Sequence, residues 1–182
     1  MKRSIVIGAA ATVLLGAAGY TGLSLSAGAA SSAVERQSGF LLLPPAAPAG
    51  QMVLFGHIKT LKRTGNHYRL RFDPAWFTSG ITANTAAAED GVVPKGQPVP
   101  NDNYIVDESH RLLTYLVPPK AHVTVLTNQG TKGISATPIT AAELSRIVNG
   151  GKHRKLFEPL DSGVWIRVRI DTVREFDQQY RP

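Results

Sequence analysis

Two segments of this chain place apolar residues at every second position, and this period of two constrains the fold more than any other feature. Residues 67–72 read HYRLRF and residues 164–171 read VWIRVRID. Because successive side chains of a strand point to opposite faces, each segment predicts a β-strand with one face in the core. Before the first segment, Arg63-Thr64-Gly65-Asn66 predicts a hairpin turn that joins it to a strand over residues 52–61.

Further short strands are predicted over residues 104–106, 112–117 and 122–127. Asp73-Pro74 predicts an end to the strand at residues 67–72, because proline cannot donate to a sheet. One helix is predicted over the alanine-rich residues 82–89, and a second begins at a capping box formed by Thr140 and Glu143. Roughly five to seven strands without βαβ spacing indicate a mainly β (α+β) fold. We expect a small antiparallel sheet or an OB-like barrel with one or two short helices.

The first 30 residues have the three parts of a secretory signal peptide. They contain the basic residues Lys2 and Arg3, then a long apolar run, then the small residues AGA at 27–29. The predicted localisation is therefore secreted or associated with the cell envelope. A retained N-terminal membrane anchor is the alternative, because the apolar run has nearly the length that spans a bilayer.

Beyond the signal peptide, the sequence divides into a linker and one domain. Residues 31–50 are rich in proline and alanine and predict a linker, and residues 51–182 predict a single mainly β domain. The chain contains no cysteine, which excludes disulfides, thiolate metal sites and cysteine nucleophiles. The formal net charge of +7 favours association with anionic partners.

The usual catalytic signatures are missing from the sequence. It has no G-x-S-x-G, S-x-x-K, H-E-x-x-H, G-x-x-x-x-G-K-[ST] or G-x-G-x-x-G motif, and its five histidines are scattered. No catalytic residue and no organic cofactor are therefore predicted, and the residues favour a non-enzymatic protein. A carboxylate pair such as Glu89 and Asp107 leaves a carboxylate-dependent hydrolase as one alternative.

An acidic stretch over residues 83–110 interrupts the strand patterns. Its oxygen-bearing side chains are of the type that calcium binds, although their spacing matches no EF-hand. The candidate metal ligands are Asp90, Asn101, Asp102, Asp107 and Glu108. A calcium- or cation-dependent binding protein that uses the 89–108 loop is therefore a second alternative, and the competing interpretation is that these side chains only brace the fold.

A basic face edged by an aromatic residue is the other candidate site. If the strands at residues 67–72 and 164–170 share one sheet face, six side chains form a stripe: Lys59, Arg69, Arg71, Trp165, Arg167 and Arg169. Arginine combined with aromatic rings suits anionic polymers. For an exported protein we expect an anionic envelope polymer or lipid head group as partner, rather than nucleic acid. The alternative is a solvated face that keeps the sheet edges soluble.

Several strings in residues 56–182 are together similar to a known family: TANTAAAEDG, VPNDNYIVDE, LLTY, PITAAELSRIVNG, KLFEPL, VWIRV and DQQYRP. They resemble a family of small exported proteins of unknown function from high-GC Gram-positive bacteria (actinobacteria). The resemblance implies export and transfers no catalytic residue, cofactor or partner. Together with the residues, it favours an envelope or extracellular binding module with a basic face.

Overall fold

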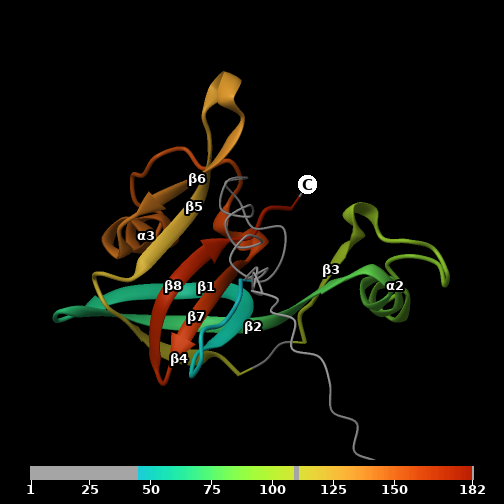
Figure 1. Ribbon diagram of the computed structural model, residues 1–182, viewed down its shortest axis with the longest axis horizontal. Coiled ribbons are helices and arrows are strands. Elements are labelled where there is room, and N and C mark those ends of the chain that lie inside the picture. Colours follow the sequence, from blue (N-terminus) through green and yellow to red (C-terminus); the bar gives the residue numbers. More distant parts are fainter. Residues whose placement is uncertain (1–44, 109–110, 182) are drawn as a thin grey trace, which may run out of the picture.

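The computed structural model describes residues 45–108 and 111–181 (Figure 1). The predicted signal peptide and most of the predicted linker lie outside these residues. The elements in chain order are β1 (Met52–Thr64), β2 (His67–Ser79), α2 (Gly80–Glu89), η1 (Pro100–Asp102), β3 (Asn103–Val106), β4 (Leu113–Val117), β5 (His122–Asn128), η2 (Gly130–Lys132), β6 (Ile134–Ile139), α3 (Ala141–Val148), η3 (Leu160–Ser162), β7 (Val164–Arg169) and β8 (Thr172–Gln178).

Five of the strands close into a barrel. β1 pairs with β2 on one edge and with β7 on the other, β2 pairs with β4, β4 with β8, and β8 with β7. This order, β1-β2-β4-β8-β7, confirms the prediction of a mainly β fold with a small barrel and one or two short helices. The sheet is not wholly antiparallel, because β4 and β5 both pair with β8 in the parallel sense. Parallel pairing is available here because long connections separate these strands in the chain.

The barrel interior is filled by the inward-facing residues of each strand. Leu61, Leu70, Phe72, Ile166 and Phe176 are all fully buried, and Leu70, Phe72 and Ile166 follow the alternation that the sequence predicts. Helix α3 covers one end of this core through its own buried residues.

Polar contacts also fasten α3 to the barrel. Ser145 Oγ and Asn149 Nδ2 donate to the Leu61 carbonyl at 2.7 and 3.0 Å. Thr140 Oγ1 accepts from the Glu143 backbone N–H at 3.1 Å, as half of the predicted capping box. The Glu143 carboxylate instead contacts Arg154 at 2.6 Å.

The prediction that β2 ends at Asp73-Pro74 is wrong, because β2 continues to Ser79. Its second edge pairs with β4 as far as Phe72 and with β3 from Trp76 onward. Pro74 lies between these two partners, where the outer edge of β2 needs no donor. The extended end of β2 carries β3 and α2 away from the barrel as a separate lobe (Figure 1).

The C-terminal segment is held by the amides of two buried glutamines. Gln178 accepts from the Leu126 backbone N–H at 2.8 Å and donates to the Glu158 carbonyl at 2.9 Å. Gln179 Oε1 accepts from the Trp165 indole N–H at 2.5 Å. A buried amide with satisfied donors and acceptors stabilises one arrangement of the chain, so this tail is an integral part of the domain.

We predict that Gly56→Ala destabilises the domain by about 3 kcal/mol or more. An added Cβ would lie 2.1 Å from the Asp73 carbonyl oxygen and 2.9 Å from Phe72 Cζ, so β1 and β2 would have to separate. Urea unfolding measures the change. Gly65→Asn is the control, because this turn position has φ of +60° and open space around it, and asparagine tolerates that conformation. Equal stability of the two variants would contradict the close approach at Gly56.

Candidate anion-binding groove

A groove of about 510 Å³ lies on the outer face of β1, β2 and β4. It is lined by three threonines, one lysine and three arginines: Thr60, Lys62, Arg63, Thr64, Arg69, Arg71 and Thr114. No carboxylate and no aromatic ring is among these lining residues. The polar side-chain groups of the lining are therefore all cations or hydroxyls.

The strand register explains why these side chains meet. Lys62 lies opposite Arg69, Thr60 lies opposite Arg71, and Arg71 in turn lies opposite Thr114. A bulge at Lys59 shifts the register between Ile58 and Thr60. Because a bulge inserts one extra residue, the positions after it change faces. Thr60 and Lys62 consequently point outward, beside the arginines of β2.

No acid among the described residues neutralises the cations of the groove. Like charges directly opposite each other in a sheet repel, as Lys62 and Arg69 do here. Within residues 45–108 and 111–181, none of the four groove cations is ion-paired with a carboxylate. Arg71 Nη1 donates to Thr114 Oγ1 at 2.9 Å, and Arg63 Nε donates to the Gly65 carbonyl at 3.3 Å. These neutral partners orient the two guanidinium groups and leave their charge uncompensated.

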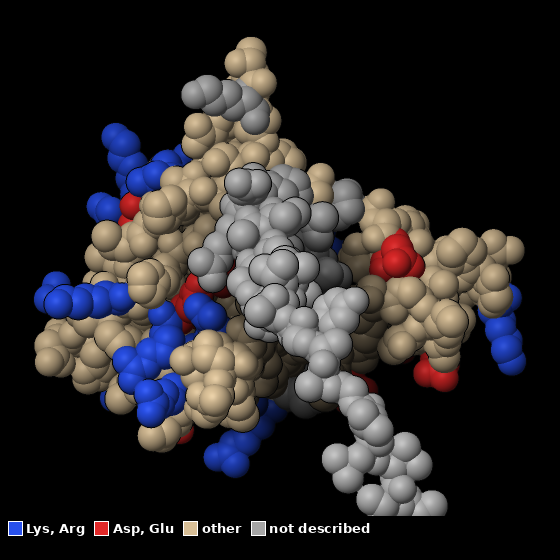
Figure 2. Space-filling view, in the orientation of Figure 1, with Lys and Arg blue, Asp and Glu red and all other residues tan. Residues whose placement is uncertain are grey.

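The rest of the surface has an uneven charge distribution. Figure 2 shows Lys and Arg gathered over the barrel and α3, while the lobe with α2 shows acidic side chains. Residues 80–108, which form that lobe, contain five carboxylates and one lysine, Lys95. Five of the thirteen acids of the chain therefore lie in this segment, and none of them lines the groove.

Only two of the six predicted polyanion-binding residues, Arg69 and Arg71, line the groove. The prediction of a single stripe is wrong, because β7 pairs with the first half of β1 and the arginines of β2 lie opposite its second half. The two strands therefore occupy different parts of the barrel wall. Arg169 is exposed at the end of β7, outside the groove.

The other three predicted residues have structural partners. Lys59 Nζ lies 2.8 Å from the buried Asp73 Oδ2, and this hydrogen bond raises the pKa of Lys59. Arg167 forms an ion pair with Glu175. Trp165 is only 6% exposed and packs on Phe55, with ring centroids 5.0 Å apart. None of these three side chains contributes to the groove.

Lys62 and Arg63 were missed by the sequence reasoning, although a signal for them was present. The predicted turn at Gly65-Asn66 sets Thr64 opposite His67, and counting back along the hairpin places Lys62 opposite Arg69. The bulge at Lys59 has no comparable signal. The contribution of Thr114 also required the pairing of β2 with β4, which lies far along the chain.

The acidic stretch does not gather into one site. Within the described residues, no three His, Asp or Glu side chains are arranged to hold a metal ion. Asp90 Oδ2 accepts from the Tyr104 hydroxyl at 2.9 Å, which raises the pKa of Tyr104 and ties the end of α2 to β3. Asn103 Nδ2 donates to the Asn101 carbonyl at 2.8 Å. These two contacts fit the interpretation of a structural brace.

The remaining predicted metal ligands also lie in different places. Asn101 and Asp102 adopt positive φ angles of 61° and 53° in the turn at η1. Asp107 lines a different cavity, together with Lys59, and Glu108 is exposed. Glu89 lines a third pocket, on α2. Glu89 and Asp107 are therefore not a pair that shares one cavity.

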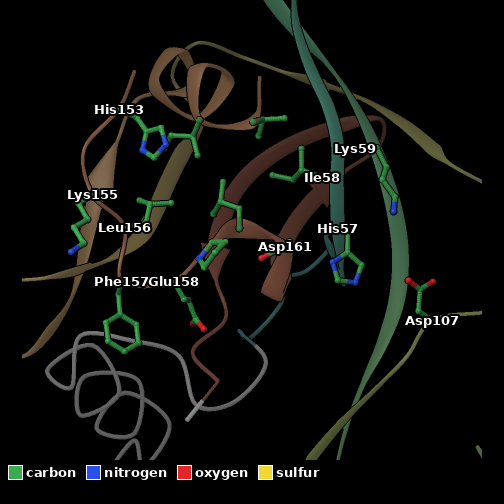
Figure 3. A pocket seen from close by; sticks show the side chains of 14 residues that line it. His57, Ile58, Lys59, Asp107, His153, Lys155, Leu156, Phe157, Glu158 and Asp161 are labelled. Carbon is green, nitrogen blue, oxygen red and sulfur yellow. The ribbon is translucent and has the colours of Figure 1, made fainter. Parts of the chain in front are cut away.

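Another cavity, of about 800 Å³, lies between β1 and the connector that follows α3 (Figure 3). β1 contributes His57 and Lys59, and the connector contributes His153, Leu156 and Glu158 among others. Acidic, basic and aliphatic side chains are mixed along its wall, so the cavity does not concentrate one charge. Burial raises the pKa of Glu158, and the backbone N–H of Arg181 offsets part of this shift. Glu158 therefore also holds the C-terminal segment.

Comparisons of the chain with protein-family models, with curated proteins and with solved structures found no match. Among residues 45–108 and 111–181, no helix combines the length and the hydrophobicity needed to cross a membrane.

We predict that Lys59→Met destabilises the domain by about 1–3 kcal/mol, because it leaves the buried Asp73 carboxylate without its cation. Asp73 Oδ1 already has no hydrogen-bond partner, so this carboxylate has little to compensate the loss. Lys62→Met is the matched control, and we expect a change within about 0.5 kcal/mol, because it removes a like-charge repulsion from an exposed position. Thermal unfolding of both variants is the measurement, and a larger loss for Lys62→Met would refute the assignment.

Asp177 supplies a prediction about pH. Burial raises the pKa of Asp177, while the Thr124 hydroxyl and the charge of Arg167 offset part of the shift. A carboxyl whose pKa is raised on folding holds its proton more tightly in the folded state. The contribution of Asp177 to the free energy of unfolding is therefore greatest below the ordinary pKa of an aspartate. It falls as the pH rises from that pKa to the raised pKa of the folded state, and it is constant at higher pH.

We expect Asp177→Asn to reduce this fall, because it removes the titrating group. Thr124→Val should enlarge the fall, because it removes a hydrogen bond that lowers the pKa. Melting temperatures between about pH 4 and pH 8 test both variants. Parallel curves for the wild type and both variants would show that Asp177 titrates as it does in the unfolded chain.

Proposed function

We propose that this protein is an exported, non-enzymatic binding module that holds an anionic polymer in the groove on β1, β2 and β4. The observation that carries the proposal is the grouping of four cations around one groove, with no neutralising acid in the part of the chain that the structure describes: Lys62, Arg63, Arg69 and Arg71. An anion bound between Lys62 and Arg69 would remove their mutual repulsion and accept charge-assisted hydrogen bonds. Binding would thus remove a like-charge repulsion that is present on this face in the unbound protein.

The predicted signal peptide supports a partner outside the cell. An anionic envelope polymer is then the relevant ligand class, and nucleic acid is less accessible there. The concave shape also supports a polymer, because a strand can enter a groove of this size and a flat bilayer cannot follow its walls. The resemblance to a family of exported proteins is consistent with this setting.

The alternative functions have less support from the site geometry. A cation site would need converging oxygen ligands, and the described acids of the 89–108 loop lie in different places. A carboxylate-dependent hydrolase would need two acids facing one substrate, whereas Glu89 and Asp107 line separate pockets. The groove is the place where several side chains of one chemistry converge.

The salt dependence of binding tests the proposal. With four cations in contact with a flexible polyanion, log K should fall with log[salt] with a slope of about −3. The double variant Arg69→Ala/Arg71→Ala should bind more weakly and have a slope smaller by about 1.4, because two contacts are lost. Fluorescence anisotropy with labelled polyglutamate and labelled poly(glycerol phosphate), over about 50–300 mM NaCl, measures both quantities.

Arg174→Ala is the control, because Arg174 is exposed on β8 and does not line the groove. We expect its slope to match that of the wild type. If neither polymer binds, or if Arg174→Ala weakens binding as much as the double variant, the groove is not the site and the proposal fails.

A further inference from the structure

We infer that the groove recognises a phosphodiester-linked chain whose charges lie on its backbone, such as a poly(polyol phosphate). This inference rests on the proposed function and names the chemistry of its ligand. The lining of the groove consists only of threonine, lysine and arginine. That lining has no aromatic ring on which a sugar ring or a base could stack. The lining therefore favours a ligand that is recognised through its charged groups.

The second step concerns the shape of the anion. The donors come from three neighbouring strands, about 4.8 Å apart, so they approach a bound anion from several directions. Arg71 Nη1 donates to Thr114 Oγ1 at 2.9 Å, which leaves the Thr114 O–H available to donate to a ligand. The two charged oxygens of a phosphodiester accept hydrogen bonds from directions spread around each P–O bond, whereas a carboxylate accepts mainly in its own plane. Mixed arginine and hydroxyl donors on several strands match the phosphate better.

The third step concerns spacing. The pairing of the strands divides the groove into two rows, one with Lys62 and Arg69 and one with Thr60, Arg71 and Thr114. Adjacent rows on a strand are two residues apart, which is about 6.5–7 Å. A phosphodiester chain with a short polyol between its phosphates can place one charge in each row. Phosphates joined directly to each other are closer together and would crowd one row.

An anionic lipid surface carries the same phosphodiester chemistry and is the competing source. Leu116 lies beside Arg69 on β4 and is 42% exposed, and Ile170 is 82% exposed at the β7–β8 turn. Two isolated aliphatic side chains next to a concave groove are a small insertion surface. The structure therefore favours the polymer, and the lipid becomes one arm of the test.

The test compares three probes by calorimetry with the full chain: a glycerol phosphate oligomer, a galacturonate oligomer with the same number of charges, and vesicles that contain phosphatidylglycerol. We expect the glycerol phosphate oligomer to bind about tenfold more tightly than the galacturonate oligomer. Thr114→Val should reduce this preference to about threefold or less and leave the galacturonate affinity unchanged. Thr172→Val, a matched change on β8 outside the groove, should keep the full preference.

Three other outcomes would distinguish failure of the phosphodiester inference from failure of the proposed anion-binding function. Equal affinities for both oligomers, lost together in Arg69→Ala/Arg71→Ala, would overturn the phosphodiester inference and leave the anion-binding function in place. Binding of neither oligomer and no vesicle binding would refute both. Vesicle binding without oligomer binding, lost in Leu116→Ser/Ile170→Gly, would overturn the polymer in favour of a lipid surface.

Discussion

The barrel depends on the close approach of β1 and β2 at Gly56. β1 pairs with β7 through residues 52–56 and with β2 through residues 55–64, so the two sets of partners meet at this point. The Asp73 carbonyl lies where a side chain of residue 56 would stand. Because glycine has no Cβ, β1 can bend through this contact and join both sides of the barrel.

The same strand also separates two chemical environments. Its first half faces Trp165 and Arg167 of β7, whose polar groups are engaged by Gln179 and Glu175. After the bulge at Lys59, its second half faces the arginines of β2. The bulge thus turns Thr60 and Lys62 of β1 to the outer face, beside the arginines of β2. This one-residue shift in the register of β1 therefore adds the side chains of β1 to the lining of the groove.

The positions of the acids determine which cations of the barrel are ion-paired. Asp73, Glu175 and Glu143 each hold one cation of the barrel or its connector in an ion pair. Exposed ion pairs contribute little to stability, but each one neutralises a cation that could otherwise attract an anion. The groove is basic because its four cations have no such partner among the described residues. This contrast is the physical basis of the proposed function.

The sequence by itself determined the local elements of this protein. Alternation in HYRLRF and VWIRVR predicted strands, Gly65-Asn66 predicted the hairpin turn, and Thr140 predicted the start of α3, because each signal depends on neighbouring residues. The continuation of β2 past Pro74 and the strand β6 were missed, since each depends on a partner strand elsewhere in the chain. Of the candidate sites, Arg69 and Arg71 were identified, whereas their grouping with Lys62 and Thr114 was not. Only the tertiary structure decided that grouping, because register between distant strands and a single bulge determine which side chains face one another.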